Sequence, residues 1–518
     1  MNTVNITYIC IFSCALLIWD ALSAQEVPTV TTDVGTFNGV YKTSEFDGMQ
    51  YRVTRFLGIR YGREPTGDLR FMKPEPFVYD ELHEATEFGS ACPQVDMMGL
   101  GEDSDVEDCL FLNLFIPESK PDMSSGYSVI IFIHGGGYEF GSSSLIPGDI
   151  MAAVGSAIVV TFNYRLGIFG FLNPGDGRFP GNAGLWDQRL AIQWVHDNIR
   201  HFGGDPERVT LLGESNGAMS ALIQGMYPNN RGLFNNIIAI SGTPFTPPGL
   251  PNNNLMSAQY FAQLVVCYPK GETFKQCMQT TDMPYFMMTL NKAAKDIEKW
   301  SRLNFFPTVD GEMIKEDPLE MLKRFKEKDL EEINCLRSVG LLVGLSSAEG
   351  GVFVMHMANE TNENKLTRQD MEKIYIPKYT PFVVDFQEGI QEDLINKLVL
   401  AEYTDWNNHM DARRHYAKFM GDINYNIPAM ELLTMYSKLN TSRTWLFNFD
   451  VVLNQRLLPT PTWLEGANHG DILAPLFGFP DNFNYGLYRN IDTYTATDAE
   501  VELSRRLITH VTTFAKSG

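Results

Sequence analysis

A serine lies in the middle of the stretch GESNG, where Ser215 has Gly213 two residues before it and Gly217 two residues after it. A serine hydroxyl acts as a nucleophile when a base removes its proton and N–H groups stabilise the oxyanion that its attack creates. Because the G-x-S-x-G pattern also arises by chance, Ser215 is a candidate only if the chain supplies a base, an acid and an oxyanion hole.

A glycine-rich turn that could supply oxyanion donors occurs at HGGG, residues 134–137. It ends an apolar strand predicted within 128–137 and precedes Ser215, where hydrolases with a nucleophilic serine on a turn place a second set of donors. Three glycines allow the main chain to approach a tetrahedral intermediate closely. The alternative is a glycine turn with only a structural role.

Among nine histidines, His469 best fits the base. Its stretch, EGANHGDIL, follows a late predicted strand at 444–452 and has glycines on both sides. Hydrolases of this kind have the chain order serine, then Asp or Glu, then histidine. Glu349 fits the acid because it follows the predicted strand 339–347 and precedes two glycines, whereas Asp310 is typical of a turn residue.

The elements that must position these residues alternate between apolar strands and helices. This pattern is typical of a parallel sheet buried on both faces, and one large α/β domain is the simplest architecture. Segments 252–335 and 365–435 are rich in helical patterns and are expected to cover the strand ends. Strands are predicted at 128–137, 157–165, 208–215, 235–242, 339–347 and 444–452, and helices at 184–204 and 216–227.

Ser215 falls at the junction between the predicted strand 208–215 and the predicted helix 216–227. So tight a turn pushes the serine main chain toward a strained conformation, and the neighbouring glycines prevent side-chain clashes. The helix would direct N–H groups and the positive end of its dipole toward the serine oxygen. This context favours a nucleophile over a serine with a structural role.

The composition of the 518-residue chain indicates an acidic globular protein, with a formal net charge of −22 and a pI near 4.8. Such a charge disfavours nucleic acids and anionic membrane surfaces as partners. An acidic surface could also attract cationic substrates, a question that net charge does not decide. No break in composition marks a linker, so we expect one domain over residues 25–518.

The N-terminus is typical of a targeting segment. An apolar run at residues 8–19 precedes the small residues of DALSAQE, which predicts a signal peptide over residues 1–24 and a secreted protein. A signal anchor is the alternative. The run is too short to span a bilayer comfortably, and no later run is longer, so no transmembrane segment is expected.

Cysteine usage agrees with an oxidising compartment. Five cysteines follow the predicted signal peptide, and two close pairs could each close a short surface loop. Cys335 is left over and is expected to be a buried thiol. Two sequons, at Asn359 and Asn440, fit a glycosylated protein. The close pairs are Cys92 with Cys109 and Cys267 with Cys277.

The sequence resembles the type-B carboxylesterase/cholinesterase family of α/β-hydrolases over about residues 26–518. The block at 181–215 is the most specific part of the resemblance. The matching stretches are EDCLFLNLF (107–115), HGGGYEFGS (134–142), FNYRLGIFGFL (162–172), GNAGLWDQRLAIQWVHDNIRHFGGDPERVTLLGES (181–215), AEGG (348–351) and NHGDIL (468–473).

The resemblance implies a serine esterase that works through an acyl-enzyme. Ser215 would be the nucleophile, His469 the general base and acid, and Glu349 the residue that orients the histidine. The N–H groups of Gly136, Gly137 and Asn216 would form the oxyanion hole. The resemblance also implies the disulfides Cys92–Cys109 and Cys267–Cys277. No cofactor or metal is expected, and the partner is a small ester.

Within the family we expect a carboxylesterase for uncharged esters, with a cholinesterase as the alternative. The loop 93–108 lacks the aromatic residue with which cholinesterases bind a quaternary ammonium group. Counting back from Pro307 places Ser301 and Leu303 where cholinesterases have an aromatic acyl pocket. Glu214 and Tyr138, beside the two motifs, are also expected in the substrate pocket.

A non-catalytic adhesion protein related to neuroligins is the alternative from another class. Such relatives usually lack a triad residue, whereas all three positions are filled here. Two features depart from the family pattern. GESNGA replaces the usual GESAGG, so Asn216 introduces a larger side chain. The sequence ends at HVTTFAKSG, where relatives usually continue through a G-x-P-N turn, so we expect truncation there.

Overall fold

The molecule is described by a computed structural model that covers most of the chain. The predicted signal peptide and the sequons at Asn359 and Asn440 lie outside the described residues. Residues described are 27–95, 104–121, 123–246, 249–267, 272–324, 331–357, 366–383, 392–404, 412–438, 443–479 and 496–518.

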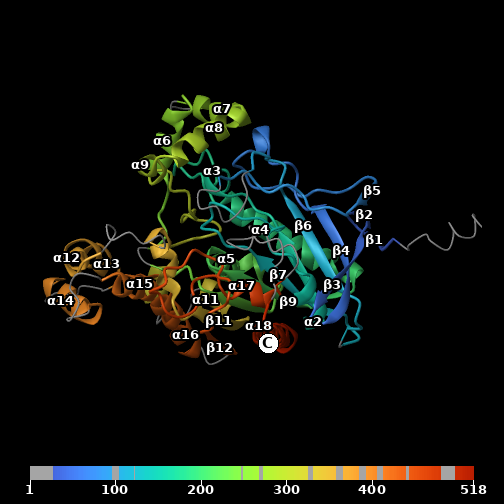
Figure 1. Cartoon of the computed structure of the whole chain (residues 1–518). Helices are drawn as coiled ribbons and strands as arrows, with labels where there is room; N and C mark the ends of the chain where they lie inside the picture. The colour runs from blue at the N-terminus through green and yellow to red at the C-terminus, as the bar shows by residue number, and fades with distance from the viewer. Residues whose placement is uncertain are drawn as a thin grey trace, which may run out of the picture.

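A nine-stranded mixed sheet forms the centre of the described fold, in the order β12-β11-β10-β9-β7-β8-β6-β4-β3 (Figure 1). A separate three-stranded sheet, β1-β2-β5, lies beside the edge of the main sheet that contains β3 and β4 (Figure 1). The strands are β1 Thr29–Thr32, β2 Gly35–Asn38, β3 Val40–Phe46, β4 Met49–Arg60, β5 Leu82–Glu84, β6 Phe111–Pro117, β7 Tyr127–Ile133, β8 Ile158–Phe162, β9 Gly204–Glu214, β10 Asn236–Ile240, β11 Gly340–Ser346 and β12 Thr444–Phe449.

The strands from β12 to β8 are parallel, which confirms the predicted α/β class. The pairings β8–β6, β6–β4 and β4–β3 are antiparallel. Strands β3, β4 and β6 were not predicted: β3 and β4 carry polar and charged residues that interrupt any apolar run, whereas β6 is largely apolar and was overlooked.

Helices cover both faces of the sheet. On one face α4 and α5 pack against residues such as Val129 and Ile131, and on the other α2, α17 and α18 pack against Ile130 and Phe132. Alternate side chains of β7 therefore enter opposite cores. These helices are α2 Asp149–Gly155, α3 Gly167–Phe171, α4 Ala183–Asn198, α5 Asn216–Met226, α17 Leu473–Leu476 and α18 Asp498–Ser517, with 3-10 turns at Gly67–Leu69, Ile199–Phe202 and Pro228–Asn230.

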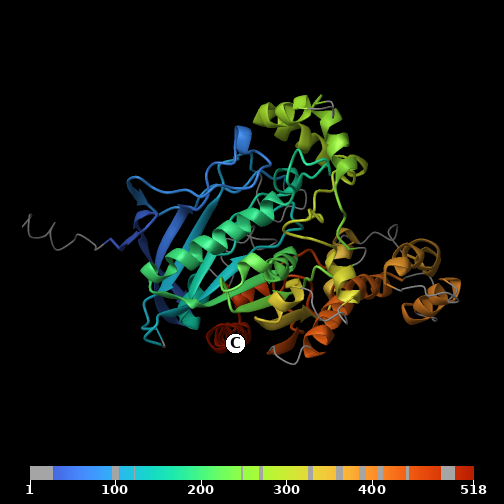
Figure 2. The same ribbon diagram turned by 180° about the vertical axis from the view of Figure 1, so that it is seen from behind.

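The remaining helices come mostly from the segments 252–335 and 365–435, and many of them lie beyond the strand ends, as predicted (Figures 1 and 2). Helix α11, Glu331–Leu336, instead packs on α5, and α16, Ile427–Lys438, contacts β12. Figure 1 shows α6–α9 as a lobe at the top and α12–α14 as a lobe at the left. The helices of the first segment are α6 Leu255–Leu264, α7 Glu272–Thr280, α8 Met283–Ala294, α9 Ile297–Trp300, α10 Pro318–Lys323 and α11 Glu331–Leu336. Those of the second are α12 Arg368–Asp370, α13 Ile376–Val383, α14 Glu392–Glu402, α15 Arg413–Gly421 and α16 Ile427–Lys438, with π-helical turns at Met371–Tyr375 and Asp422–Asn426.

The junction between α4 and β9 is among the element boundaries that differ from those predicted. The helix predicted over 184–204 ends at Asn198, continues as a 3-10 turn and stops at Gly203, whose φ is +83°. Strand β9 consequently begins at Gly204, four residues before the predicted start at 208. A glycine with positive φ ends a helix more abruptly than the apolar pattern reveals.

Both implied disulfides, Cys92–Cys109 and Cys267–Cys277, are present, and Cys335 is a buried free thiol. Within the described ranges, no helix is both long and apolar enough to cross a membrane.

Candidate active site

Ser215 occupies the sharp turn between β9 and α5, with φ +56° and ψ −125°. Its N–H donates to the carbonyl of Ile240 at 2.8 Å, which ties the turn to strand β10. A Cβ at Gly213 would lie 2.2 Å from the main chain of Gly217, and one at Gly217 would lie 2.0 Å from the Ile133 carbonyl. The two glycines are therefore required sterically for the strained serine conformation.

His469 and Glu349 lie in line with this serine. Nε2 of His469 is 3.0 Å from Oγ of Ser215, and Nδ1 is 2.7 Å from Oε2 of Glu349. Both His469 and Glu349 are almost completely buried. A carboxylate on Nδ1 fixes the imidazole tautomer, which leaves Nε2 able to accept the serine proton.

Glu349 begins the 3-10 turn Glu349–Met357 directly after β11, and two further donors fix its other oxygen. Oγ of Ser241 and the N–H of Ser346 both donate to Oε1 of Glu349, each at 2.6 Å. Sequence reasoning missed Ser241. Its position in the sequence could have identified it: Ser241 directly follows β10, which lies between β9 and β11, the strands that precede Ser215 and Glu349.

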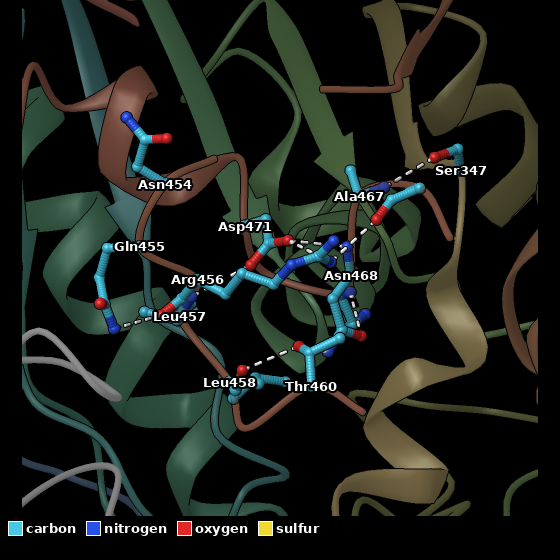
Figure 3. Close-up of polar contacts among 12 residues, drawn as sticks. Ser347, Asn454, Gln455, Arg456, Leu457, Leu458, Thr460, Ala467, Asn468 and Asp471 are labelled. Atoms are coloured by element: carbon cyan, nitrogen blue, oxygen red, sulfur yellow. Dashed lines mark hydrogen bonds and ion pairs between the residues drawn. The ribbon is translucent and has the colours of Figure 1, made fainter. Parts of the chain in front are cut away.

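The loop that carries His469 is held by a buried carboxylate (Figure 3). Asp471 accepts from the N–H of Asn468 at 2.8 Å and of Leu457 at 3.1 Å, and it pairs with Nη1 of Arg456 at 3.4 Å. Oγ of Ser347 accepts from the N–H of Ala467 at 2.9 Å. These contacts fix the main chain on both sides of the imidazole.

Two carboxylates besides Glu349 influence the charge of the histidine. Oε1 of Glu214 is 3.5 Å from Nε2 of His469, and burial raises the pKa of Glu214 to about 7. Burial alone would lower the pKa of His469, but Glu214 and Glu349, with a smaller effect of Asp471, raise it above its ordinary value. The site therefore favours the imidazolium that forms when the base accepts a proton.

The HGGG turn lies against the serine. A Cβ at Gly135 would be 3.1 Å from Cβ of Ser215, and φ is +98° at Gly136 and +67° at Gly137. Asn216 is the first residue of α5, where N–H groups have no partner inside the helix. Among the described residues, no hydrogen bond uses the N–H of Gly136, Gly137 or Asn216. These three donors are available to an oxyanion.

A cavity of about 790 Å³ opens at Ser215. Its wall combines apolar side chains with amides and hydroxyls. No Asp, Glu, Lys, Arg or His is among the described residues that line it. The lining includes Gly137, Asn216, Met219, Thr243, Thr246, Leu250, Pro251, Asn254, Leu255, Met256, Asn304, Phe306, Pro307, Phe353, Asn424 and Tyr425.

The four residues expected in the substrate pocket are not part of this lining. Ser301 is exposed and donates to the Glu298 carbonyl, while Leu303 is buried in the core. Tyr138 is buried and its hydroxyl accepts from Ser220, and Glu214 contacts His469 from behind the cavity. From the same segment, Asn304 and Phe306 line the cavity.

Comparison with known proteins gives one consistent result. The carboxylesterase family matches residues 26–518. The chain is 32% identical to a cholinesterase of Mus musculus over 520 residues, which cover 95% of this chain and 79% of the relative. It is 29% identical to an acetylcholinesterase of Bungarus fasciatus (98% and 81% covered) and 30% identical to a bile salt-activated lipase of Bos taurus (96% and 80% covered).

Proposed function

Because the chain belongs to the carboxylesterase family of α/β-hydrolases and its relatives include carboxylic ester hydrolases, we propose that it is a secreted serine carboxylesterase for uncharged esters. The observation that supports this most directly is the alignment of Ser215, His469 and Glu349 at distances of 3.0 and 2.7 Å. Each residue then has one role in acyl transfer.

Acylation begins when Oγ of Ser215 attacks the ester carbonyl and His469 takes its proton on Nε2. The carbonyl oxygen becomes an oxyanion that accepts from the N–H groups of Gly136, Gly137 and Asn216, each worth about 2.7–4 kcal/mol in the transition state. His469 then protonates the leaving alkoxide, the carbon–oxygen bond breaks, and the acyl group remains on Ser215.

Deacylation repeats these steps with water. His469 removes a proton from water as its oxygen attacks the acyl carbonyl, and the proton returns to Oγ of Ser215 as the carboxylic acid leaves. Throughout, Glu349 accepts from Nδ1 and stabilises the imidazolium, while Ser241 and Ser346 hold Glu349 in place.

The preference for uncharged esters rests on the cavity wall. No charged side chain is among its described lining residues, and the loop 93–108 contains no aromatic side chain for a quaternary ammonium group. A cholinesterase-like enzyme is the alternative, since two relatives carry that name. A neuroligin-like adhesion protein is the non-catalytic alternative.

The chain is also proposed to consist of a cleaved N-terminal segment and one hydrolase domain. Residues 1–24 form a signal peptide that is removed, and residues 25–518 form the hydrolase domain. Asn359 and Asn440 carry glycans. Expression in cells with a secretory pathway tests this: the protein should appear in the medium, begin near residue 25 and shift in mobility after enzymatic deglycosylation. A protein retained in the cytosol with an intact N-terminus would contradict it.

Active-site labelling tests the enzymatic function. A fluorophosphonate probe should modify Ser215, and mass spectrometry should locate the adduct on the peptide that contains GESNG. The matched control, Ser215→Ala, should fold with the same Tm and remain unlabelled. The wild type should hydrolyse neutral p-nitrophenyl and longer aliphatic esters in preference to acetylcholine. A preference for acetylcholine would support the cholinesterase alternative, and a folded protein that reacts with neither probe nor ester would support adhesion.

A further inference from the structure

A tyrosine ring lies against the imidazole of His469. The ring centroids of Tyr425 and His469 are 4.7 Å apart, and the two planes are inclined by 37°. Tyr425 also lines the cavity at Ser215, so the contact lies at the reacting centre. The mechanism above assigns no role to this residue, which belongs to none of the sequence motifs.

Tyr425 is held in place by an unusual turn of the chain. It lies in the π-helical turn Asp422–Asn426, between α15 and α16. Asp422 fixes this turn by accepting from the hydroxyl of Tyr403 at 2.8 Å and from Nδ2 of Asn426 at 2.7 Å. A π-helical turn inside an otherwise α-helical segment has a cost in stability and often occurs at functional sites.

The same segment is packed against both sides of the site. A Cβ at Gly350 would lie 1.7 Å from the carbonyl of Ala417, so α15 lies directly on the residue after Glu349. On the other side, Oγ1 of Thr246 donates to the Asn424 carbonyl at 3.0 Å and joins the turn to the cavity wall. The position of Tyr425 is therefore tied to the turn that carries Glu349.

We propose that Tyr425 is a positioning residue for His469, whose ring holds the imidazole between Glu349 and Ser215 and stabilises it when it is protonated during acyl transfer. The proposal rests on the proposed esterase function, in which His469 is the base.

The two hydrogen bonds of His469 do not by themselves fix the tilt of its imidazole ring. The bonds to Glu349 and Ser215 lie at opposite ends of the ring, so they define an axis about which the imidazole can still tilt. A flat side chain against the ring opposes this tilt. An aromatic face also attracts a cation, so it stabilises the imidazolium more than the neutral imidazole.

Other charged groups act on His469 as well. Glu349 lies at Nδ1, Glu214 at Nε2, and Asp471 is on the same loop, where it pairs with Arg456. None of these carboxylates is removed by a change at Tyr425. A shift in titration after substitution of Tyr425 alone is therefore attributable to the ring.

The test compares Tyr425→Leu with Tyr425→Phe in the full-length protein. With a neutral p-nitrophenyl ester, Tyr425→Leu should lower kcat by about ten-fold and move the midpoint of the acidic limb of the pH–rate profile to lower pH. Tyr425→Phe keeps the ring and should restore both values to within about two-fold of the wild type. Phe306→Leu removes another aromatic wall residue of the cavity, one whose ring contacts Tyr138 and not Tyr425, and should change KM without moving the pH midpoint.

A spectroscopic measurement separates this proposal from the proposed function. The proton between Nδ1 of His469 and Glu349 should give a downfield ¹H NMR resonance, because it lies in a short charge-assisted hydrogen bond. Tyr425→Leu should broaden this resonance or speed its exchange, and Tyr425→Phe should not, even if no ester is hydrolysed. An unchanged resonance with unchanged kcat and pH midpoint in Tyr425→Leu would overturn the proposal; an inactive wild type that shows the expected NMR response would overturn only the esterase function.

Discussion

Glu214 lies with Oε1 3.5 Å from Nε2 of His469, the same nitrogen that is 3.0 Å from Oγ of Ser215. Glu214, the residue before Ser215, thus lies next to the imidazole and is not among the described lining residues of the cavity. Oε1 of Glu214 is buried and, within the described part of the chain, accepts no hydrogen bond. The ionised form of Glu214 is therefore stabilised mainly by protonated His469, so the titrations of Glu214 and His469 are coupled.

Glu214→Gln should shift the activity profile toward lower pH. In the proposed mechanism activity requires neutral His469, so activity should rise as the pH rises through the pKa of that residue. The Glu214 charge raises this pKa, and its removal should move the acidic limb down by about 0.5–1 pH unit. The pH dependence of kcat/KM with a neutral ester measures the shift. An acidic limb that stays in place would show that Glu214 does not act on His469.

Glu214→Gln should also stabilise the protein at alkaline pH. Because burial raises the pKa of Glu214 to about 7, the folded state binds this proton more tightly than the unfolded state does. The stabilisation that this proton contributes is therefore fully present below the unfolded pKa, near 4.5, and is lost as the pH rises to about 7 and above. At pH 8 the variant should gain about 1–3 kcal/mol in free energy of unfolding. Denaturant titrations at pH 4 should show no difference, and a loss of stability at pH 8 would contradict the prediction.

Ser241→Ala should reduce kcat more than KM. The substitution removes one of the two donors to Oε1 of Glu349, so the carboxylate that orients His469 loses part of its restraint. Hydrogen bonds to charged groups are worth about 1.5–3 kcal/mol, and we expect a fall in kcat of about ten-fold. The control is Ser301→Ala, an exposed serine that donates only to a helix carbonyl. Equal kinetics of the two variants would exclude a role for Ser241.

Asn216→Ala should widen the range of accepted esters. Its main-chain N–H is retained, while its side chain, whose Oδ1 lies 3.5 Å from Oγ of Ser215, occupies part of the cavity wall. Removing it should raise the ratio of kcat/KM for long-chain over acetyl esters by about ten-fold. Acyl-chain profiling of both proteins provides the measurement. Unchanged kinetics and ester preference would show that Asn216 acts only through its main chain.

Asp471→Asn should loosen the loop that carries His469. The substitution leaves the side chain of Arg456 without its anionic partner and weakens the bonds to the N–H groups of Asn468 and Leu457 (Figure 3). Breaking a largely buried pair costs about 3–5 kcal/mol, and the Tm should fall accordingly. Compared with the wild type, the variant should show faster hydrogen exchange at residues 466–471 and unchanged exchange in strand β9. Uniform exchange in wild type and variant would contradict a local role.

Local sequence patterns made the positions of Ser215, Glu349 and His469 predictable. Only glycines fit beside the strained Ser215, so the turn leaves a recognisable pattern, and Glu349 and His469 follow strands whose apolar runs are continuous. The antiparallel strands β3 and β4 lack such runs, and sequence reasoning did not find them; it also missed β6, which is largely apolar. The lining residues Asn304 and Phe306 were not predicted, because which side chain faces a cavity depends on how a loop packs.

The order of the motifs along the chain, the glycines and the alternation of apolar segments were sufficient to determine the α/β architecture and the three residues at its centre. Tertiary structure alone brought Ser241 and Tyr425 to that centre, whereas Asp471 follows His469 closely in the NHGDIL stretch. The side chains of Ser241 and Tyr425 contact residues far from them in the sequence, and no local spacing encodes such contacts. The sequence therefore specified the three aligned side chains, and packing decided how firmly they are held.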